Sequence, residues 1–290
     1  MPRWLKVSLL SVVALVLVLG GGGYFYGKSI GIIPSHDYET APPTVPAFTR
    51  PAVLIFNKTN GFVHKDAIPV ADVVFSELAD AQGWDVFVTD NAAVHNPGVL
   101  GKFQLVIWNN VSGDVLTAEQ RESLVQWLNA GGGWVGVHGS GGDTAYDWEW
   151  YVNTLIGAQF VGHTMDPQFQ DAALLVSEPG TALTAHLPAP WIVPAEEWYA
   201  FASNPRDKGY EILLTIDQDS YVTTGESASS WMQGWTDRME GEHPLAWRHT
   251  LGQGRVFYSA IGHQPGTYQL PEYRQLLGKA MRWAMDGSEQ

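Results

Sequence analysis

Short apolar segments alternate with helical patterns after residue 50, and this alternation limits the possible folds more than any other feature. The apolar segments are residues 51–56, 84–88, 103–108 and 133–138, and helical spacing covers residues 66–82 and 117–130. Each apolar segment has the length of a buried strand. The resulting β-α-β-β-α-β order predicts a parallel sheet with right-handed crossovers, covered by helices.

The rest of the chain contains more strand patterns. We expect one more helix and then a series of strands before a closing helix. The predicted elements are a helix over residues 146–156, strands near 168–177, 197–201, 210–216, 245–249 and 255–261, and a helix over 271–285. No proline-rich linker follows residue 50, so we predict a single α/β domain over residues 51–290 rather than two domains.

Charge and cysteine content exclude several functions. From residue 51 onward the chain has 12 basic and 28 acidic residues, a net charge of −16. A field of that sign repels phosphate backbones, so we predict no nucleic-acid partner and leave neutral substrates and cations open. The chain has no cysteine, which excludes disulfides, thiolate metal sites and a cysteine nucleophile.

The N-terminal segment, residues 1–28, has the pattern of a membrane anchor or a signal segment. Residues 7–26 form a run of 20 uncharged residues, about the length that spans a bilayer, and Arg3 and Lys6 precede it. We expect a single-pass anchor at the cell membrane with the main domain outside the cytoplasm. The alternative is secretion after cleavage of a signal peptide. Residues 29–50 contain several prolines and no apolar period, which predicts an extended linker.

Histidines follow three of the predicted strands. His64 lies in the loop after the first strand, His138 ends the fourth, and His263 follows the strand over residues 255–261. Parallel sheets bind ligands beyond the carboxyl ends of their strands, so we expect these side chains to converge. Imidazoles suit acid–base catalysis or ligation of a divalent transition metal, and both roles remain open.

The segment after the fourth strand resembles a sharp strand-to-helix turn. Glycines flank His138, and the same turn contains Ser140 and Asp143. Ser140 is an alternative nucleophile, although the motif of a nucleophile elbow is not strictly present. Asp143 could hydrogen-bond sugar hydroxyls or cap the helix expected at residue 146.

Two adjacent carboxylates precede the strand over residues 197–201. Side chains alternate along a strand, so we expect Glu197 to point inward and Glu196 outward. Glu197 would then act as a base or orient a histidine. Among 13 tryptophans, Trp198, Trp231, Trp235 and Trp247 lie near turns and could stack on sugar rings, although core packing is the commoner role. Residues 223–241 lack a clear period and could form a substrate-facing loop.

Several segments taken together are similar to the ThuA-like (trehalose-utilisation) family. The segments are FNKTNGFVH, GGGWVGVHGSGGD, FVGH, EEWYAF and HPLAWRHTLGQGRVFYSAIGH, and the similarity covers roughly residues 51–287. The resemblance implies a flavodoxin-like three-layer sandwich, as in class I glutamine amidotransferases, preceded here by the predicted membrane helix. It also implies sugar metabolism without glutaminase activity, since the amidotransferase cysteine is absent.

The resemblance places further residues at the site. His138 falls at or beside the amidotransferase elbow. His163 matches a Gly-His that the family usually continues with proline, whereas Thr164 follows here. The family's usual Asp-Glu is Glu196-Glu197 in this chain. Both differences are mild departures from the family pattern.

We therefore expect a sugar-active enzyme whose reacting groups are histidines and a carboxylate. The expected catalytic residues are His138, Glu197, His64 and His263, the expected substrate contacts are Asp143, His163, Tyr199 and Trp247, and the candidate metal ligands are His64, His138 and His263. The ligand would be a carbohydrate or a sugar-derived small molecule. The alternative is a non-catalytic carbohydrate-binding or sensing module of the cell envelope.

Overall fold

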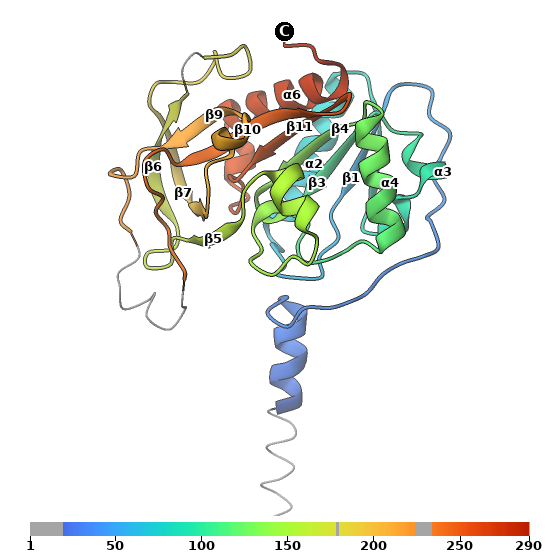
Figure 1. Cartoon of the computed structure of the whole chain (residues 1–290), viewed down its shortest axis with the longest axis horizontal. Helices are drawn as coiled ribbons and strands as arrows, with labels where there is room; N and C mark the ends of the chain where they lie inside the picture. Colours follow the sequence, from blue (N-terminus) through green and yellow to red (C-terminus); the bar gives the residue numbers. More distant parts are fainter. Residues whose placement is uncertain (1–19, 178–179, 224–233, 290) are drawn as a thin grey trace, which may run out of the picture.

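A computed structural model describes residues 20–177, 180–223 and 234–289, and it shows one large sheet between layers of helices (Figure 1). The sheet has nine strands in the order β2-β1-β3-β4-β11-β10-β9-β6-β7. Strands β2, β1, β3, β4 and β11 run parallel, in the 2-1-3-4-5 order of flavodoxin-like proteins. The predicted α/β fold with parallel central strands is confirmed.

The bounds of the elements follow the apolar patterns closely in the parallel half. The parallel strands are β1 (Ala52–Phe56), β2 (Asp85–Thr89), β3 (Leu105–Asn109), β4 (Gly133–Val137) and β11 (Gly254–Ser259). The α-helices are α2 (Ala67–Ala81), α3 (Pro97–Leu100), α4 (Ala118–Asn129) and α6 (Pro271–Asp286). Short 3₁₀ turns cover Ala92–Val94, His138–Gly141, Pro205–Lys208 and Thr267–Gln269.

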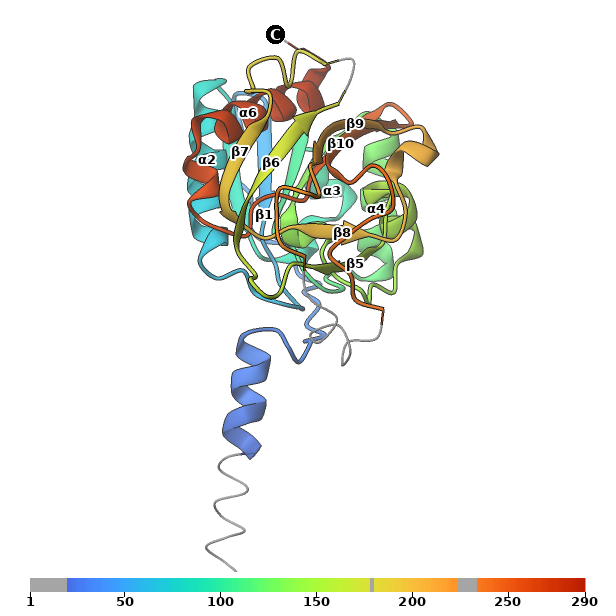
Figure 2. The same ribbon diagram turned by 90° about the vertical axis from the view of Figure 1, so that its left-hand side faces the viewer.

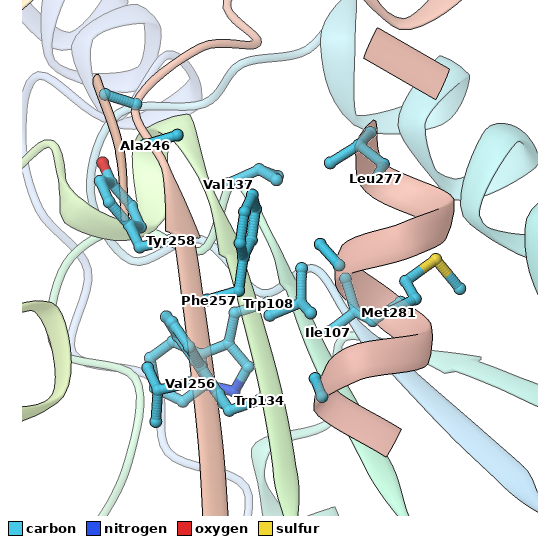
Figure 3. Packing of buried hydrophobic residues seen from close by; sticks show 14 of the residues in the cluster. Ile107, Trp108, Trp134, Val137, Ala246, Val256, Phe257, Tyr258, Leu277 and Met281 are labelled. Atoms are coloured by element: carbon cyan, nitrogen blue, oxygen red, sulfur yellow. The ribbon is translucent and has the colours of Figure 1, made fainter. Parts of the chain in front are cut away.

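Helices cover both faces of the parallel strands. Figure 2 shows α2 and α6 on one face and α3 and α4 on the other. Helix α4 begins at a complete capping box between Thr117 and Gln120, as the sequence predicted. Apolar side chains fill the core under α6, where Leu277 and Met281 pack toward Ile107 and Phe257, as Figure 3 shows.

The second half adds antiparallel strands to one side of the sheet. They are β10 (Pro244–Leu251), β9 (Glu211–Ile216), β6 (Gln170–Val176) and β7 (Trp191–Glu196). A separate two-stranded sheet pairs β5 (Phe160–His163) with β8 (Tyr199–Phe201). The strand predicted over residues 197–201 is therefore shorter than expected, and β7 was not predicted. Pro194 weakens the strand pattern of β7, which lies at the edge of the sheet, where proline is tolerated.

The helix predicted over residues 146–156 begins later than expected. Residues 146–148 are not helical, and Tyr151–Ile156 forms a π-helix. The Asp143 carboxylate accepts a hydrogen bond from the amide of Ala145 (2.8 Å). It therefore stabilises a local turn and does not cap a helix at Tyr146, which corrects that alternative.

The N-terminal part of the described chain is a short helix followed by an extended segment. Residues 20–29 are helical, and the rest of the predicted 7–26 span lies outside the described residues. Within residues 20–177, 180–223 and 234–289, no helix has the length and apolarity required to cross a bilayer. The extended segment, residues 30–50, follows the surface of the domain (Figure 1), and we call it the N-terminal strap.

The N-terminal strap is fastened to the domain by polar contacts along its length. Ser35 binds Asn60 through its amide and its hydroxyl. The Glu39 carboxylate forms an ion pair with the buried Lys58 (2.6 Å) and accepts a hydrogen bond from the amide of Ala92 (3.0 Å). The linker is extended, as predicted, but it lies against the folded domain.

Candidate functional site

The turn after β4 places His138 at the carboxyl edge of the parallel strands. His138 has a positive φ of 41°, which is uncommon for a residue with a side chain. Its ring Nδ1 lies 2.8 Å from the carbonyl oxygen of Ala260, which can only accept, so Nδ1 carries the proton. The lone pair of Nε2 therefore faces the space beyond the strand ends.

Ser140, the alternative nucleophile in the same turn, is fully buried. Its hydroxyl donates to the carbonyl of Trp108 (2.8 Å) and accepts from the amide of Val111 (3.2 Å). Both hydrogen-bonding roles of the hydroxyl are used within the fold. This expectation was wrong: Ser140 shapes the turn and does not face the pocket.

The three histidines expected to converge do so. His138 Nε2 lies 3.2 Å from His263 Nδ1. The His64 ring lies 4.7 Å from the His138 ring and 4.9 Å from the His263 ring, between centroids. One ligand atom from each of the three falls within 4.8 Å of the others. Nδ1 of His64 is buried and has no hydrogen-bond partner among the described residues.

Glu197 joins this group from the segment between β7 and β8. Its Oε2 lies 3.1 Å from His263 Nδ1 and 3.4 Å from His138 Nε2, and the side chain is only 2% exposed. Burial alone would raise the pKa of this carboxyl. The imidazoles of His138 and His263 outweigh burial and hold the pKa of Glu197 well below its usual range. The centre therefore contains a buried carboxylate in its ionised form.

The second carboxylate oxygen of Glu197, Oε1, is held by two further residues. Gln168 Nε2 donates to Oε1 (2.6 Å), and His163 Nδ1 lies 3.2 Å from the same oxygen. His163 Nδ1 also faces the carbonyl of Thr164 (2.7 Å), so it carries a proton. These contacts leave Oε2 alone to face His138 and His263.

Burial and nearby charges shift the pKa values of His64 and His263 in opposite directions. Burial, followed by the nearby imidazoles of His138 and His263, holds the pKa of His64 well below its usual value. Burial also opposes protonation of His263, but the hydrogen bond and charge of Glu197 outweigh it and raise the pKa of His263. The site therefore combines a neutral imidazole with one that is readily protonated.

Tyr199 and Trp235 form an aromatic side of the site. The Tyr199 ring lies over the His138 ring, with centroids 4.2 Å apart. The indole of Trp235 donates to the carbonyl of His163 (3.0 Å) and lies edge-on to its ring. Both aromatic side chains line the pocket. Flat rings with polar atoms at their edges are suited to packing against sugar faces.

A pocket of about 450 Å³ opens above these groups. Its volume lies within the range of small-molecule sites, about 300–1,000 Å³. The polar side of its lining comes from the histidines and carboxylates of the domain, namely His64, His163, His263, Glu197 and Asp143. The N-terminal strap contributes Gly31, Ile32 and Pro34 to the same lining. The strap therefore completes a wall of the pocket.

Trp247, a predicted sugar contact, and Trp198, for which core packing was the commoner expectation, both prove to be core residues. Trp247 is completely buried in β10, and its indole donates to the carbonyl of Ile156 (2.7 Å). Trp198 is also completely buried, and its indole donates to Gln170. Trp247 does not line the pocket, so its assignment as a substrate contact was wrong. Trp231 and most of the loop over residues 223–241 lie outside the described residues.

Both adjacent carboxylates point inward, which corrects the prediction for Glu196. Ala195 has a positive φ of 49°, so the strand alternation ends before the pair. Glu196 accepts hydrogen bonds from the amide of His263 (3.0 Å) and the hydroxyl of Thr267 (2.6 Å). Gln168 also contacts Glu197 but was not predicted, because it carries no recognisable signal in the sequence.

These observations define a class of protein: a flavodoxin-like α/β domain with a buried carboxylate and histidines at the carboxyl edge of its parallel strands. A family model described as "ThuA: Trehalose utilisation" matches residues 52–284. The chain belongs to the ThuA family, which confirms the resemblance and supports a sugar-related role at family level. No curated protein matches the chain.

Two solved structures share the fold over most of the chain. One is a ThuA-like protein from Bacteroides uniformis, at 24% identity and a TM-score of 0.68, covering 84% of this chain and 95% of that one. The other is a ThuA-like protein from Parabacteroides merdae, at 17% identity and a TM-score of 0.59, covering 83% of this chain and 91% of that one. At these identities the likeness establishes the fold alone.

Proposed function

We propose that this protein is an enzyme that acts on a sugar or sugar derivative bound in the pocket over Glu197. The observation that carries the proposal is the Glu197 carboxylate, 2% exposed and surrounded by His138, His163 and His263. Burying a charge costs several kcal/mol even when it is paired. Strongly perturbed carboxylates in pockets are typical of catalytic sites, whereas a module that only binds sugar needs none.

The surroundings favour a neutral, hydroxyl-rich substrate. The domain has a net charge of −16 from residue 51 onward, which disfavours anionic ligands. Tyr199 and Trp235 supply ring faces, and Asp143 and His163 supply polar groups in the same pocket. A trehalose-utilisation family is consistent with such a ligand.

The chemistry that these groups support is polarisation of, or proton transfer at, a hydroxyl or carbonyl group of the sugar. Glu197 and His263 face each other at 3.1 Å and could share a proton with a substrate oxygen. Two-carboxylate glycoside hydrolysis by the adjacent pair Glu196 and Glu197 is disfavoured because Glu196 is committed to hydrogen bonds from His263, Gln264 and Thr267. Glutaminase chemistry is not proposed, since the chain has no cysteine.

Substrate screening with matched variants tests this function. Purified protein would be incubated with disaccharides and their oxidised and aminated derivatives, and products would be detected by NMR. Once a substrate is found, Glu197→Gln should lower kcat/KM by about 10²–10⁴-fold. Glu211→Gln, a substitution of a half-exposed carboxylate that pairs with Arg248, should leave it unchanged. Equal turnover by Glu197→Gln and wild type would refute the site. Saturable binding without any product would support the sugar-binding alternative.

The proposal includes attachment to the outer face of the cell membrane by residues 1–28. It is supported by the uncharged run over residues 7–26 and the basic residues before it. Protease added to intact cells, or to spheroplasts where an outer membrane shields the surface, should digest the main domain. Digestion only after lysis would overturn the proposed location, and release into the medium would indicate cleavage of a signal peptide.

A further inference from the structure

Three atoms that can bind a metal meet beside the pocket, two from residues that line it (His263 and Glu197) and one from the fully buried His138. His138 Nε2 and His263 Nδ1 are 3.2 Å apart, His263 Nδ1 and Glu197 Oε2 are 3.1 Å apart, and His138 Nε2 and Glu197 Oε2 are 3.4 Å apart. Ligands at about 2.0–2.2 Å from a tetrahedral metal lie about 3.3–3.6 Å from one another, and octahedral neighbours lie about 3 Å apart. The triangle has the size of one face of a metal coordination sphere.

We propose that His138, His263 and Glu197 bind a divalent first-row transition metal ion, with His64 beside the remaining open position. The site rests on this geometry alone. Only the role of the metal, polarising a sugar oxygen at the open position, rests on the proposed function. Two imidazoles and a carboxylate suit zinc, iron, nickel or manganese, and the absence of cysteine disfavours a soft-metal site.

The contacts outside the triangle orient each ligand toward one point. The proton of His138 Nδ1 is held by the carbonyl of Ala260, which turns the Nε2 lone pair inward. Gln168 and His163 hold Glu197 Oε1, which leaves Oε2 facing the same point. Hydrogen bonds from ligand side chains to backbone carbonyls and polar groups are the usual outer shell of metal sites.

A single shared proton does not satisfy the hydrogen-bonding capacity of all three atoms. A single proton on His263 Nδ1 can be shared with Glu197 Oε2 and His138 Nε2. The lone pairs of His138 Nε2 and Glu197 Oε2 would still face each other at 3.4 Å. Unpaired buried polar atoms are unfavourable, and a cation among the three atoms would satisfy all of them. The alternative is a second proton on His138, and the experiment separates the two.

His64 gives a second, independent observation. Its ligand atom lies within 4.8 Å of those of His138 and His263, and its buried Nδ1 has no partner among the described residues. The separations of 3.1–3.4 Å are those among His138, His263 and Glu197, so these three are assigned as ligands and His64 is placed beside the open position. Catalytic metal sites typically have three protein ligands and one position left open for water or substrate, whereas structural sites have four protein ligands.

The test is metal binding by the full chain, solubilised where necessary, without any sugar. Metal-stripped protein would be titrated separately with Zn²⁺, Mn²⁺ and Co²⁺, by calorimetry and by the visible spectrum of bound Co²⁺. One equivalent of at least one ion should bind and raise the Tm. Glu197→Gln, which preserves the side-chain shape, and His138→Ala should each weaken binding at least tenfold. His186→Ala removes a histidine away from the pocket, where its ring contacts the carbonyl of Glu272, and should bind as wild type does.

Two results would overturn the metal site: no stoichiometric binding of any of the three ions by folded protein, or equal binding by Glu197→Gln and His138→Ala. A folded state would be verified by circular dichroism in each case. The outcomes also separate this inference from the proposed function. Metal binding without turnover of any sugar would contradict the function alone. Full sugar turnover by metal-stripped protein in the presence of a chelator would contradict the catalytic role of the metal alone.

Discussion

Glu196 and Glu197 hold the same histidine through different atoms. Glu196 Oε1 accepts from the backbone amide of His263 (3.0 Å), whereas Glu197 Oε2 faces its ring nitrogen (3.1 Å). Glu196 also accepts from the amide of Glu197 itself (2.8 Å). One carboxylate thus positions the main chain and the other contacts the ring, so the pair fixes the His263 side chain in the pocket.

Removing Glu196 should destabilise the protein and displace His263. Glu196→Ala leaves the buried donors of His263, Glu197 and Thr267 without an acceptor, at a cost of about 2–4 kcal/mol. Urea unfolding would measure this change. The control is Glu242→Ala, in a partly exposed pair with Arg206, which should cost about 0–1 kcal/mol. Equal stability of the two variants would show that Glu196 is not a structural anchor.

The parallel half of the fold was predictable because its strands are buried on both faces. β1 and β4 are short runs of apolar residues and glycine with every residue buried, and β3 is apolar up to Asn109, so their length and their flanking polar or glycine-rich segments indicate buried strands. Strand β7 could not be found in the same way. Its residues alternate irregularly in exposure, and Pro194 interrupts the pattern. Its pairing depends on the edge of β6, which is a tertiary effect.

The site was predictable where it depended on strand ends, and not where it depended on loops. His64, His138 and His263 follow β1, β4 and β11, so topology alone brings them to one edge. Gln168 reaches the centre from the loop between β5 and β6, and Glu196 from the last position of β7, after the positive φ of Ala195 has ended the strand alternation. Trp247 was misassigned because residue type and nearby turns do not reveal which face of a strand is buried.

Gly139 is required by the position of His64. A Cβ at Gly139 would lie 2.9 Å from the His64 ring and 3.3 Å from the carbonyl oxygen of Asn110. Gly139→Ala should therefore push the His64 ring away, with a stability cost of about 1–3 kcal/mol from overpacking. A displaced group at the site should lower kcat/KM by tenfold or more, up to about 10²-fold for a shift of 1 Å.

The His64 displacement can be measured without a substrate. NMR of the histidine side chains should show a shifted His64 signal in Gly139→Ala and unchanged His95 and His243 signals. Gly266→Ala is the matched control, because nothing lies within 4 Å of its Cβ position. An unshifted His64 signal in folded Gly139→Ala would contradict the predicted displacement.

Buried histidines away from the centre should make the protein less stable in acid. Burial lowers the pKa of His95 and of His243 to about 4. An unfolded histidine has a pKa near 6.5, so between pH 6.5 and 4 the unfolded state binds more protons than the folded state. The free energy of unfolding should therefore fall as pH decreases across this window, by up to about 1.4 kcal/mol per pH unit for each histidine.

A variant of His95 separates its contribution from the others. His95→Phe keeps a ring beside Phe56 but loses the acceptor for the Trp108 indole (3.2 Å). Loss of this hydrogen bond lowers the free energy of unfolding equally at all pH values. Loss of the titrating imidazole makes the free energy of unfolding depend less steeply on pH between pH 6.5 and 4. Urea unfolding at several pH values would measure both. A slope unchanged from wild type would show that His95 is not the titrating group.

Releasing the N-terminal strap should open one wall of the pocket. Glu39 fastens the strap through Lys58 and the amide of Ala92, while Gly31 and Ile32 of the same strap line the pocket. Because Glu39 is partly exposed, Glu39→Ala should weaken this attachment by only about 1–2 kcal/mol, which raises the fraction of molecules with a detached strap roughly tenfold.

Limited proteolysis should then cleave residues 30–50 about tenfold faster in Glu39→Ala than in wild type. The control is Arg50→Ala, which removes an exposed pair with Asp85 at the far end of the strap and should leave cleavage near residue 32 unchanged. The polar contacts of Glu197 within the described residues come from His138, His163, Gln168 and His263 and not from the strap. The KM for an identified sugar should therefore rise in Glu39→Ala while kcat stays within about twofold, as expected for lost uniform binding. Cleavage of Glu39→Ala at the wild-type rate would show that other contacts, such as Ser35 with Asn60, hold the strap.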